Sequence, residues 1–165
     1  MRTPTTRRRA LAWSGAAAAG LLAGCSDGSG ASGSAGTQTN DAARRAALRL
    51  RENATRTSLD LLAHYDALLK KHPGQADRLK PLRGEVARQA KVLRGKGRAV
   101  AGNAPVTVAA DPAAALGELA AAERRASDAH LAALPGATPE LARLLASVAA
   151  AGAGHVFLLD EGTRK

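Results

Sequence analysis

The chain of 165 residues has one cysteine, Cys25, and only three aromatic residues, Trp13, Tyr65 and Phe157. A single cysteine cannot form a disulfide within the chain, so ordinary core packing must hold a folded domain together. Proteins that bind single-stranded nucleic acid stack bases on aromatic side chains, and this chain has too few for such a surface. We therefore expect no nucleic-acid partner.

The sequence also lacks the motifs of common catalytic sites. It has no Ser–His–acid arrangement, no phosphate-binding loop, no paired cysteines and no His-Glu-x-x-His. The pairs Gly95-x-Gly97 and Gly152-x-Gly154 are too short to indicate a nucleotide site. The sequence thus indicates no particular reaction and favours a non-enzymatic protein.

The first 24 residues have the pattern of a removed export signal. Three arginines at residues 7–9 precede 13 mostly apolar residues, and small residues then lead to Cys25. Such a stretch is too short to cross a bilayer, which needs about 20 apolar residues. Residues 1–24 therefore predict a signal peptide.

Residues 21–25 (Leu-Leu-Ala-Gly-Cys) resemble the lipobox of bacterial lipoproteins. The resemblance implies that Cys25 is acylated, with palmitate as a typical chain, and becomes the first residue of the mature protein. Residues 6–11 also resemble a twin-arginine export signal, with general secretion as the alternative route. We expect an extracytoplasmic protein anchored to the cell membrane by lipid. The alternative is an ordinary signal peptide with an unmodified Cys25.

Residues 25–40 carry this cysteine and a Gly/Ser/Thr-rich segment that predicts a flexible tether. Without residues 1–24 the chain has 141 residues, enough for one domain. That part keeps 20 basic and 14 acidic side chains, so its net charge is +6.

Four helices are expected after the tether. Residues 40–41 (Asn-Asp) can cap the first, and residues 111–112 (Asp-Pro) and 138–139 (Thr-Pro) mark the starts of the third and fourth. Pro81 falls inside the second, which either kinks there or starts at Pro81 after a short turn. The expected ranges are about 41–71, 76–93, 112–134 and 139–161.

Apolar residues recur at steps of three and four in each helix, as expected when one face packs inward. Leu59, Leu62 and Leu69 share such a face in the first helix. Glu123 lies on the apolar stripe of the third helix and His155 on that of the fourth.

Connection lengths indicate the topology. The first and second helices are joined by about three residues, as are the third and fourth, so each pair is an antiparallel hairpin. Residues 94–110 join the two pairs and can extend about 55 Å, longer than a 20-residue helix of about 30 Å. This predicts an all-α four-helix bundle with ferritin-like connectivity. A plain up-down-up-down bundle is the alternative.

The segments that carry a family resemblance are spread over residues 41–161. They are residues 61–66 and 72–73, residues 81–85, residues 140–147 and residues 154–155. In these segments the chain resembles the ferritin-like lipoproteins of high-GC Gram-positive bacteria, which implies the fold without a specific activity.

Metal-binding proteins of that fold take one Glu from each of two helices and Glu-x-x-His from each of the other two. Here only Glu85, Glu123 and His155 remain, with Arg88 and Gly152 at the positions where the missing ligands would stand. We expect no cofactor and interpret Glu123 and His155 as a buried pair. A reduced metal site is the alternative.

The other histidines are predicted to be peripheral. His64 and Asp60 are four residues apart and are expected to form an exposed pair on the first helix. His130 shares the stripe of Glu123 but is expected at the rim.

The densest run of basic residues lies in and after the second helix, with Glu85 as the only acid between residues 78 and 98. It can rest on anionic lipid headgroups or on wall polymers. An ordinary solvated helix face is the alternative. The predicted surface consists of Arg78, Lys80, Arg83, Arg88, Lys91 and Arg94.

The sequence thus predicts a lipid-anchored, non-enzymatic module that binds or interacts in the cell envelope. The alternative function is a metal-binding or redox protein with a reduced site. No feature identifies a protein partner.

Overall fold

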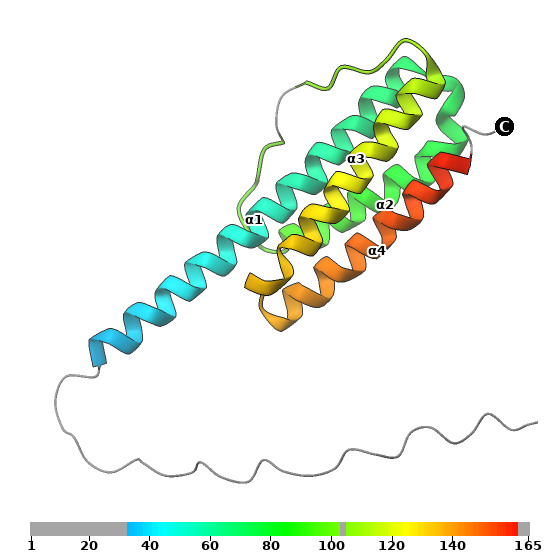
Figure 1. The fold of residues 1–165 in the computed structure, drawn as a ribbon. Helices are drawn as coiled ribbons and strands as arrows, with labels where there is room; N and C mark the ends of the chain where they lie inside the picture. Colours follow the sequence, from blue (N-terminus) through cyan, green and yellow to red (C-terminus); the bar gives the residue numbers. More distant parts are fainter. Residues whose placement is uncertain (1–32, 103–104, 162–165) are drawn as a thin grey trace, which may run out of the picture. The chain divides into compact units, whose positions relative to one another are not determined.

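The computed structural model describes residues 33–102 and 105–161, and this part of the chain contains four α-helices and no β-strand (Figure 1). Short 3-10 helices η1 (Pro73–Gln75) and η2 (Leu134–Gly136) lie in the two tight turns. The prediction of an all-helical protein with four α-helices is confirmed for these residues. The predicted signal peptide, Cys25 and residues 25–32 of the predicted tether lie outside them. The helices are α1 (Gly33–Lys71), α2 (Ala76–Arg94), α3 (Pro112–Ala132) and α4 (Pro139–Glu161).

The start of α1 differs most from the prediction. The helix begins at Gly33, so Asn40 and Asp41 lie inside it and do not cap it. The prediction of a flexible tether is therefore wrong for residues 33–40. Extending an existing helix gains a hydrogen bond for each added residue without a new nucleation cost, which offsets the weak helix propensity of Gly, Ser and Thr.

The remaining helix ends follow local chemistry. The Asp111 carboxylate accepts a hydrogen bond of 2.7 Å from the Ala114 amide, and Pro112 occupies the first turn of α3. α3 ends two residues before the expected position, and the chain continues as the 3-10 helix η2, because Pro135 has no amide hydrogen to donate to the carbonyl four residues earlier. Gly95 ends α2 with a φ of 56°, a conformation that glycine adopts without strain.

Helix α2 runs without interruption through Pro81. The proline removes the amide donor that would bond the carbonyl of Asp77. Both residues are exposed, so water can bond that carbonyl. Of the two possibilities for this segment, a later start at Pro81 is wrong.

Helix α2 is antiparallel to α1. In the first half of α2, Arg83 forms an ion pair of 2.8 Å with Asp66, late in α1. Just after α2, Gly95 lies against Arg51, whose Nη1 atom is 2.9 Å from the position of an ideal Cβ. Residue numbers therefore rise along α2 in the direction in which they fall along α1.

Helix α3 is also antiparallel to α1, and α4 is antiparallel to α3. The Tyr65 hydroxyl of α1 contacts Glu123 of α3, while Ser58, two turns earlier, contacts His130, two turns later. Glu123 also contacts His155 in the second half of α4. Consequently α2 and α3 run in the same direction.

The connection between α2 and α3 therefore runs along the second half of α1, from the level of Arg51 to the C-terminal end of the helix (Figure 1). Gly102 lies beside Leu59, and farther on the carbonyl of Val108 accepts a hydrogen bond of 2.6 Å from Lys71 Nζ. The His72 ring lies 3.0 Å from the Ala109 carbonyl. Val108 is itself buried, so this end of the connection is packed onto the helices.

The buried side of α1 differs from the predicted one. Leu61, Tyr65 and Leu68 are buried, whereas Leu59, Leu62 and Leu69 are only partly buried. Because α1 packs against both α2 and α3, two of its sides are covered, and apolar spacing alone did not distinguish them.

Buried apolar residues form two clusters. The large cluster includes Leu79, Leu116, Leu119 and Leu159. The small cluster consists of Ala54, Leu93, Leu141, Leu145 and Val148. Buried polar side chains lie between them: Ser58 falls between Ala54 and Leu61 in α1, and His155 falls between Val148 and Leu159 in α4. We call this set the polar layer; it consists of Ser58, Glu123, Ser127, His130 and His155.

Candidate functional site

Two of the three predicted metal-ligand candidates lie together in the polar layer. Glu123 Oε1 and His155 Nδ1 are 2.9 Å apart, and the two residues are 1% and 7% exposed. Both stand on the inward stripes of their helices, which face each other because α3 and α4 form a hairpin. Counting residues away from the turn between α3 and α4 places Glu123 and His155 at about the same level, as the structure shows.

Glu123 has a second partner that the sequence analysis missed. The Tyr65 hydroxyl donates a hydrogen bond of 2.6 Å to the same Oε1 atom. Tyr65 is fully buried, and burial together with the Glu123 carboxylate raises its pKa far above the ordinary value. The sequence did contain a signal for this contact: Tyr65 lies on the same stripe as Leu61 and Leu68. A buried phenol needs a polar partner, so a polar side chain could have been expected opposite it.

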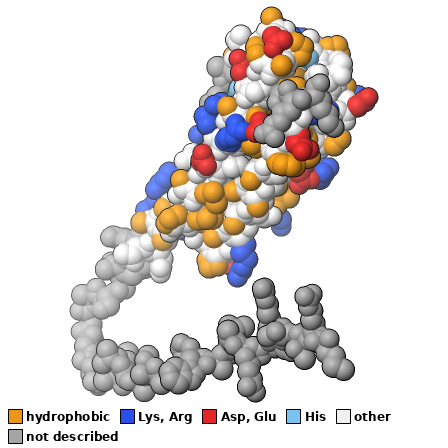
Figure 2. Space-filling model, turned by 45° about the vertical axis from the view of Figure 1, so that its right-hand side comes forward, with side chains coloured by type: hydrophobic (Ala, Val, Ile, Leu, Met, Phe, Trp, Pro, Cys, Tyr) orange, Lys and Arg blue, Asp and Glu red, His pale blue; other side chains and the backbone are white. Residues whose placement is uncertain are grey.

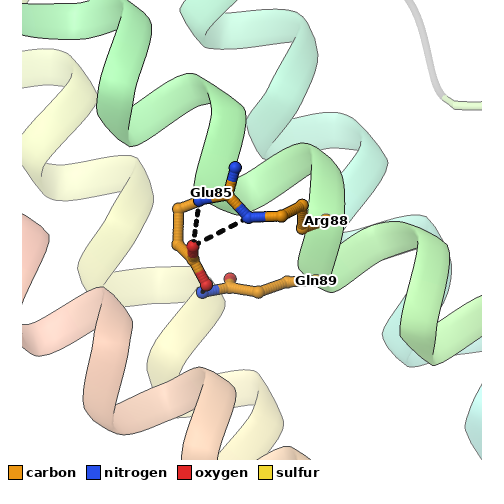
Figure 3. A network of polar contacts seen from close by, with 3 residues as sticks. All are labelled: Glu85, Arg88 and Gln89. Carbon is orange, nitrogen blue, oxygen red and sulfur yellow. Dashed lines mark hydrogen bonds and ion pairs between the residues drawn. The ribbon is translucent and has the colours of Figure 1, made fainter.

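The third candidate, Glu85, is not part of this group. Its carboxylate is held by Arg88, one turn later in α2, and Gln89 Nε2 donates a further hydrogen bond of 3.4 Å (Figure 3). The hydrogen bonds from Arg88 are the main reason that the pKa of Glu85 is lowered. The side chain is 40% exposed, so the carboxylate belongs to the surface.

Gly152 stands where a Glu-x-x-His motif would place its carboxylate, three residues before His155. An ideal Cβ at Gly152 would lie 2.2 Å from Ser127 Oγ and 3.3 Å from Glu123 Oε2. A side chain at this position would therefore collide with the Ser127 hydroxyl unless that hydroxyl moves or is removed. The hydroxyl of Ser127 is buried and has no hydrogen-bond partner among the described residues.

The described residues contain no group of three or more His, Cys, Asp or Glu side chains placed to hold a metal ion. A cation at the polar layer would find the carboxylate of Glu123 and the imidazole of His155. Glu123 Oε1 already lies within hydrogen-bond distance of both Tyr65 and His155. As arranged, the hydroxyl of Tyr65 and the ring of His155 both have this carboxylate oxygen as a hydrogen-bond partner.

The prediction that His130 is a rim residue is wrong. The residue is 2% exposed, and its Nε2 atom lies 3.3 Å from Ser58 Oγ. Burial lowers its pKa, and the Glu123 charge opposes this effect. His130 stands near the end of α3, but α1 continues well beyond that level and covers it.

The prediction of an exposed pair of His64 and Asp60 is also corrected. Both side chains are half-buried, and they line a shallow pocket between α1 and α3 together with Arg125. Burial, and then the charge of Arg125, lower the pKa of His64, while Asp60 opposes them.

The predicted basic surface divides into two groups. Arg78 donates hydrogen bonds to the Leu158 and Leu159 carbonyls near the end of α4, while Arg83 binds Asp66 and Arg88 binds Glu85. Arg83 and Arg88 thus neutralise carboxylates, and Arg78 caps the carbonyl end of α4. The remaining three are exposed and form no ion pair with the described residues: Lys80, Lys91 and Arg94.

Comparison with known protein families, characterised proteins and solved structures found no match to this chain. Among the described residues, α4 alone is long and apolar enough to cross a membrane by length and composition. About a third of its most apolar stretch, 33%, is buried in the structure. Because the core helix of a soluble protein passes the same test, this is weak evidence for a span.

Proposed function

We propose that this chain is a bacterial lipoprotein held on the outer face of the cell membrane through Cys25. Its helical part is a non-enzymatic module that binds phosphate-rich polymers or lipid headgroups of the envelope. The lipobox-like residues 21–25 support the anchor, and the exposed cations of α2 support the binding role.

The proposed fold is a ferritin-like four-helix bundle. Two antiparallel hairpins joined by a connection along α1, with α2 and α3 in the same direction, support this topology. An up-down-up-down bundle would instead place α3 parallel to α1. The contacts of Tyr65 with Glu123 and of Ser58 with His130 have the opposite order.

The observation that carries the binding role is the set of free cations on α2. Lys80, Lys91 and Arg94 are exposed, and Lys96 and Arg98 follow them in the exposed connection. A cluster of one sign of charge attracts polyanions over a distance of about 10 Å at 0.1 M salt. We call these five residues the cationic surface.

The fold extends the cationic surface onto α1. Arg51 lies against Gly95, beside the end of α2. The exposed residues Arg44, Arg45 and Arg49 precede it in α1. This half of α1 is the described part nearest in sequence to Cys25. Each Lys or Arg held near an anionic membrane contributes about 1 kcal/mol of binding free energy.

Vesicle binding tests this role. The full chain with Cys25→Ser, which removes the acyl site, is titrated with vesicles of phosphatidylglycerol and phosphatidylcholine and with vesicles of phosphatidylcholine alone. Soluble polyphosphate as a competitor separates a preference for polymer from one for lipid. We expect binding to anionic vesicles that weakens steeply with salt.

Two variants of equal charge change give the control. Lys91→Glu/Arg94→Glu alters the cationic surface, and Lys70→Glu/Arg125→Glu alters exposed cations elsewhere. The first is expected to weaken binding at least tenfold and the second less than threefold. Equal losses would show that net charge alone acts, and equal binding to neutral vesicles would contradict the proposal.

A metal-handling protein is the second candidate, because Glu123 and His155 touch inside the fold. Stoichiometric iron, zinc or manganese in the purified full chain, lost on Glu123→Ala and on His155→Ala, would favour it. We expect the protein to keep no stoichiometric metal after dialysis, because Glu123 Oε1 is within hydrogen-bond distance of both Tyr65 and His155.

A further inference from the structure

The outward face of α4 is apolar along most of its length. Between Arg143 and Asp160 the helix has no ionisable side chain other than buried His155. Phe157 and Leu158 are 60% and 49% exposed. Figure 2 shows hydrophobic side chains reaching the surface of the helical region, with charged side chains around them. The exposed residues of this face are Ala146, Ser147, Ala150, Gly154, Phe157 and Leu158.

Two opposite charges stand at the ends of this face. Arg143 and Glu161 are both exposed and lie 18 residues apart, which is five helical turns or about 27 Å. At 100° per residue both fall on the side of α4 opposite the buried stripe of Leu145, Gly152 and Leu159.

The geometry points to a second copy of this chain as the partner of the α4 face. In an antiparallel pair related by a twofold axis at the level of Gly152, Arg143 of each copy lies opposite Glu161 of the other. The same axis sets the small residues Ala146 and Ser147 opposite the large residues Phe157 and Leu158. One face is thus complementary to itself in charge and in shape, as an isologous interface requires.

The centre of the face permits close approach. Ala150 and Gly154 lie on either side of the axis, and nothing lies within 4 Å of an ideal Cβ at Gly154. Small residues there let two helix backbones pack closely, while Phe157 and Leu158 fill the space on each side. One helix pair buries less than the standard interface of about 800 Å² per partner, so the dimer is expected to be weak.

A membrane surface fits the face less well. Helices that lie on membranes carry Lys and Arg along an exposed polar side, whereas the other side of α4 is the core of this fold. The face also ends in one cation, Arg143, and one anion, Glu161. A second copy in the antiparallel direction presents these two charges in the opposite order, so it fits this face better than a uniformly anionic membrane.

Sedimentation velocity on the full chain with Cys25→Ser tests the inference. We expect a sedimentation coefficient that rises with concentration towards that of a dimer. Ala150→Glu places a charge at the centre of the face and is expected to weaken association at least tenfold. Ala129→Glu, at an exposed position of α3, is the matched control and is expected to change it less than twofold.

A charge exchange tests the antiparallel arrangement. Arg143→Glu and Glu161→Arg are each expected to weaken association about tenfold, since each places like charges opposite one another. The double variant Arg143→Glu/Glu161→Arg is expected to restore it to within threefold. Circular dichroism and chemical denaturation on the same samples show that each variant is folded.

Three outcomes would overturn the inference. They are a chain that stays monomeric at all concentrations, association that Ala150→Glu leaves unchanged, and a double variant that is not restored. If Ala150→Glu instead abolishes binding to phosphatidylcholine vesicles without changing self-association, the face contacts membrane and not a second copy. None of these measurements depends on the cationic surface. Failure of the α4 dimer would therefore leave the proposed binding of polyanions untouched, and the reverse also holds.

Discussion

The two apolar clusters and the polar layer between them make different demands on the sequence. The large cluster around Leu79 and Leu119 and the small cluster around Leu93 and Leu145 require only apolar side chains of fitting volume. The polar layer requires particular partners, because a buried carboxylate or imidazole without a hydrogen bond is costly. The tolerance of the fold to substitution should therefore change sharply within two helical turns of α3.

The largest expected effect comes from removing the centre of the polar layer. Glu123→Ala leaves the Tyr65 hydroxyl and the His155 ring without a partner in a buried site. We expect the free energy of unfolding to fall by about 3–5 kcal/mol, measured by chemical denaturation. The matched control Asp128→Ala, at an exposed acidic position of the same helix, is expected to cost less than about 0.5 kcal/mol. A loss below about 1 kcal/mol for Glu123→Ala would mean that the layer tolerates substitution like the clusters.

The close approach of α3 and α4 gives the next effect. Gly152→Ala forces its new Cβ against Ser127 Oγ and is expected to cost about 1–3 kcal/mol of unfolding free energy. Ser127→Ala in the same chain should recover most of the loss, since the Ser127 Cβ is 3.6 Å from the new atom and the hydroxyl has no partner to lose. Gly117→Ala, with open space around it, is the control and is expected to leave stability unchanged or raise it by about 1 kcal/mol. If Ser127→Ala does not recover stability, the steric clash of Gly152→Ala is with an atom other than Ser127 Oγ.

The smallest expected effect is a dependence of stability on pH. Burial lowers the pKa of His130 below the ordinary value of 6.5, so the unfolded chain binds a proton more readily than the folded one. Stability is therefore retained above pH 6.5 and declines as the pH falls below it. Chemical denaturation between pH 7.5 and 5.5 measures this slope, and His130→Gln is expected to flatten it. A slope that is unchanged in this variant would assign the effect to other groups, His64 among them.

Part of the polar layer could be predicted from the sequence. Glu123 and His155 lie on apolar stripes of helices joined by a short turn, and helical geometry alone brings them to one level. Tyr65 and Ser58 were missed, and His130 was wrongly expected at the rim. The contacts of these residues join positions that are 58 residues apart in one case and 72 in the other. Such pairs depend on which side of α1 turns inward, and that side was predicted incorrectly.

The surface shows the same division. The basic run of α2 is evident in the sequence. The hydrogen bond from Arg78 to the end of α4 and the ion pair of Arg83 with Asp66 are not. These two contacts and the ion pair of Arg88 with Glu85 reduce the predicted binding surface to Lys80, Lys91 and Arg94. The start of α1 at Gly33 is a further example, because local propensity there favours a loop while an established helix extends through it.

The sequence by itself determined the number of helices, the starts of α3 and α4 and the pairing of each hairpin. Caps, prolines and short turns act over a few residues, so their effect can be derived locally. Only the tertiary structure decided which face of α1 is buried, which partners Glu123 acquires and that the Ser127 hydroxyl leaves room only for glycine at position 152. These features depend on the distance between backbones that are far apart in the chain, and packing of the whole fold sets that distance.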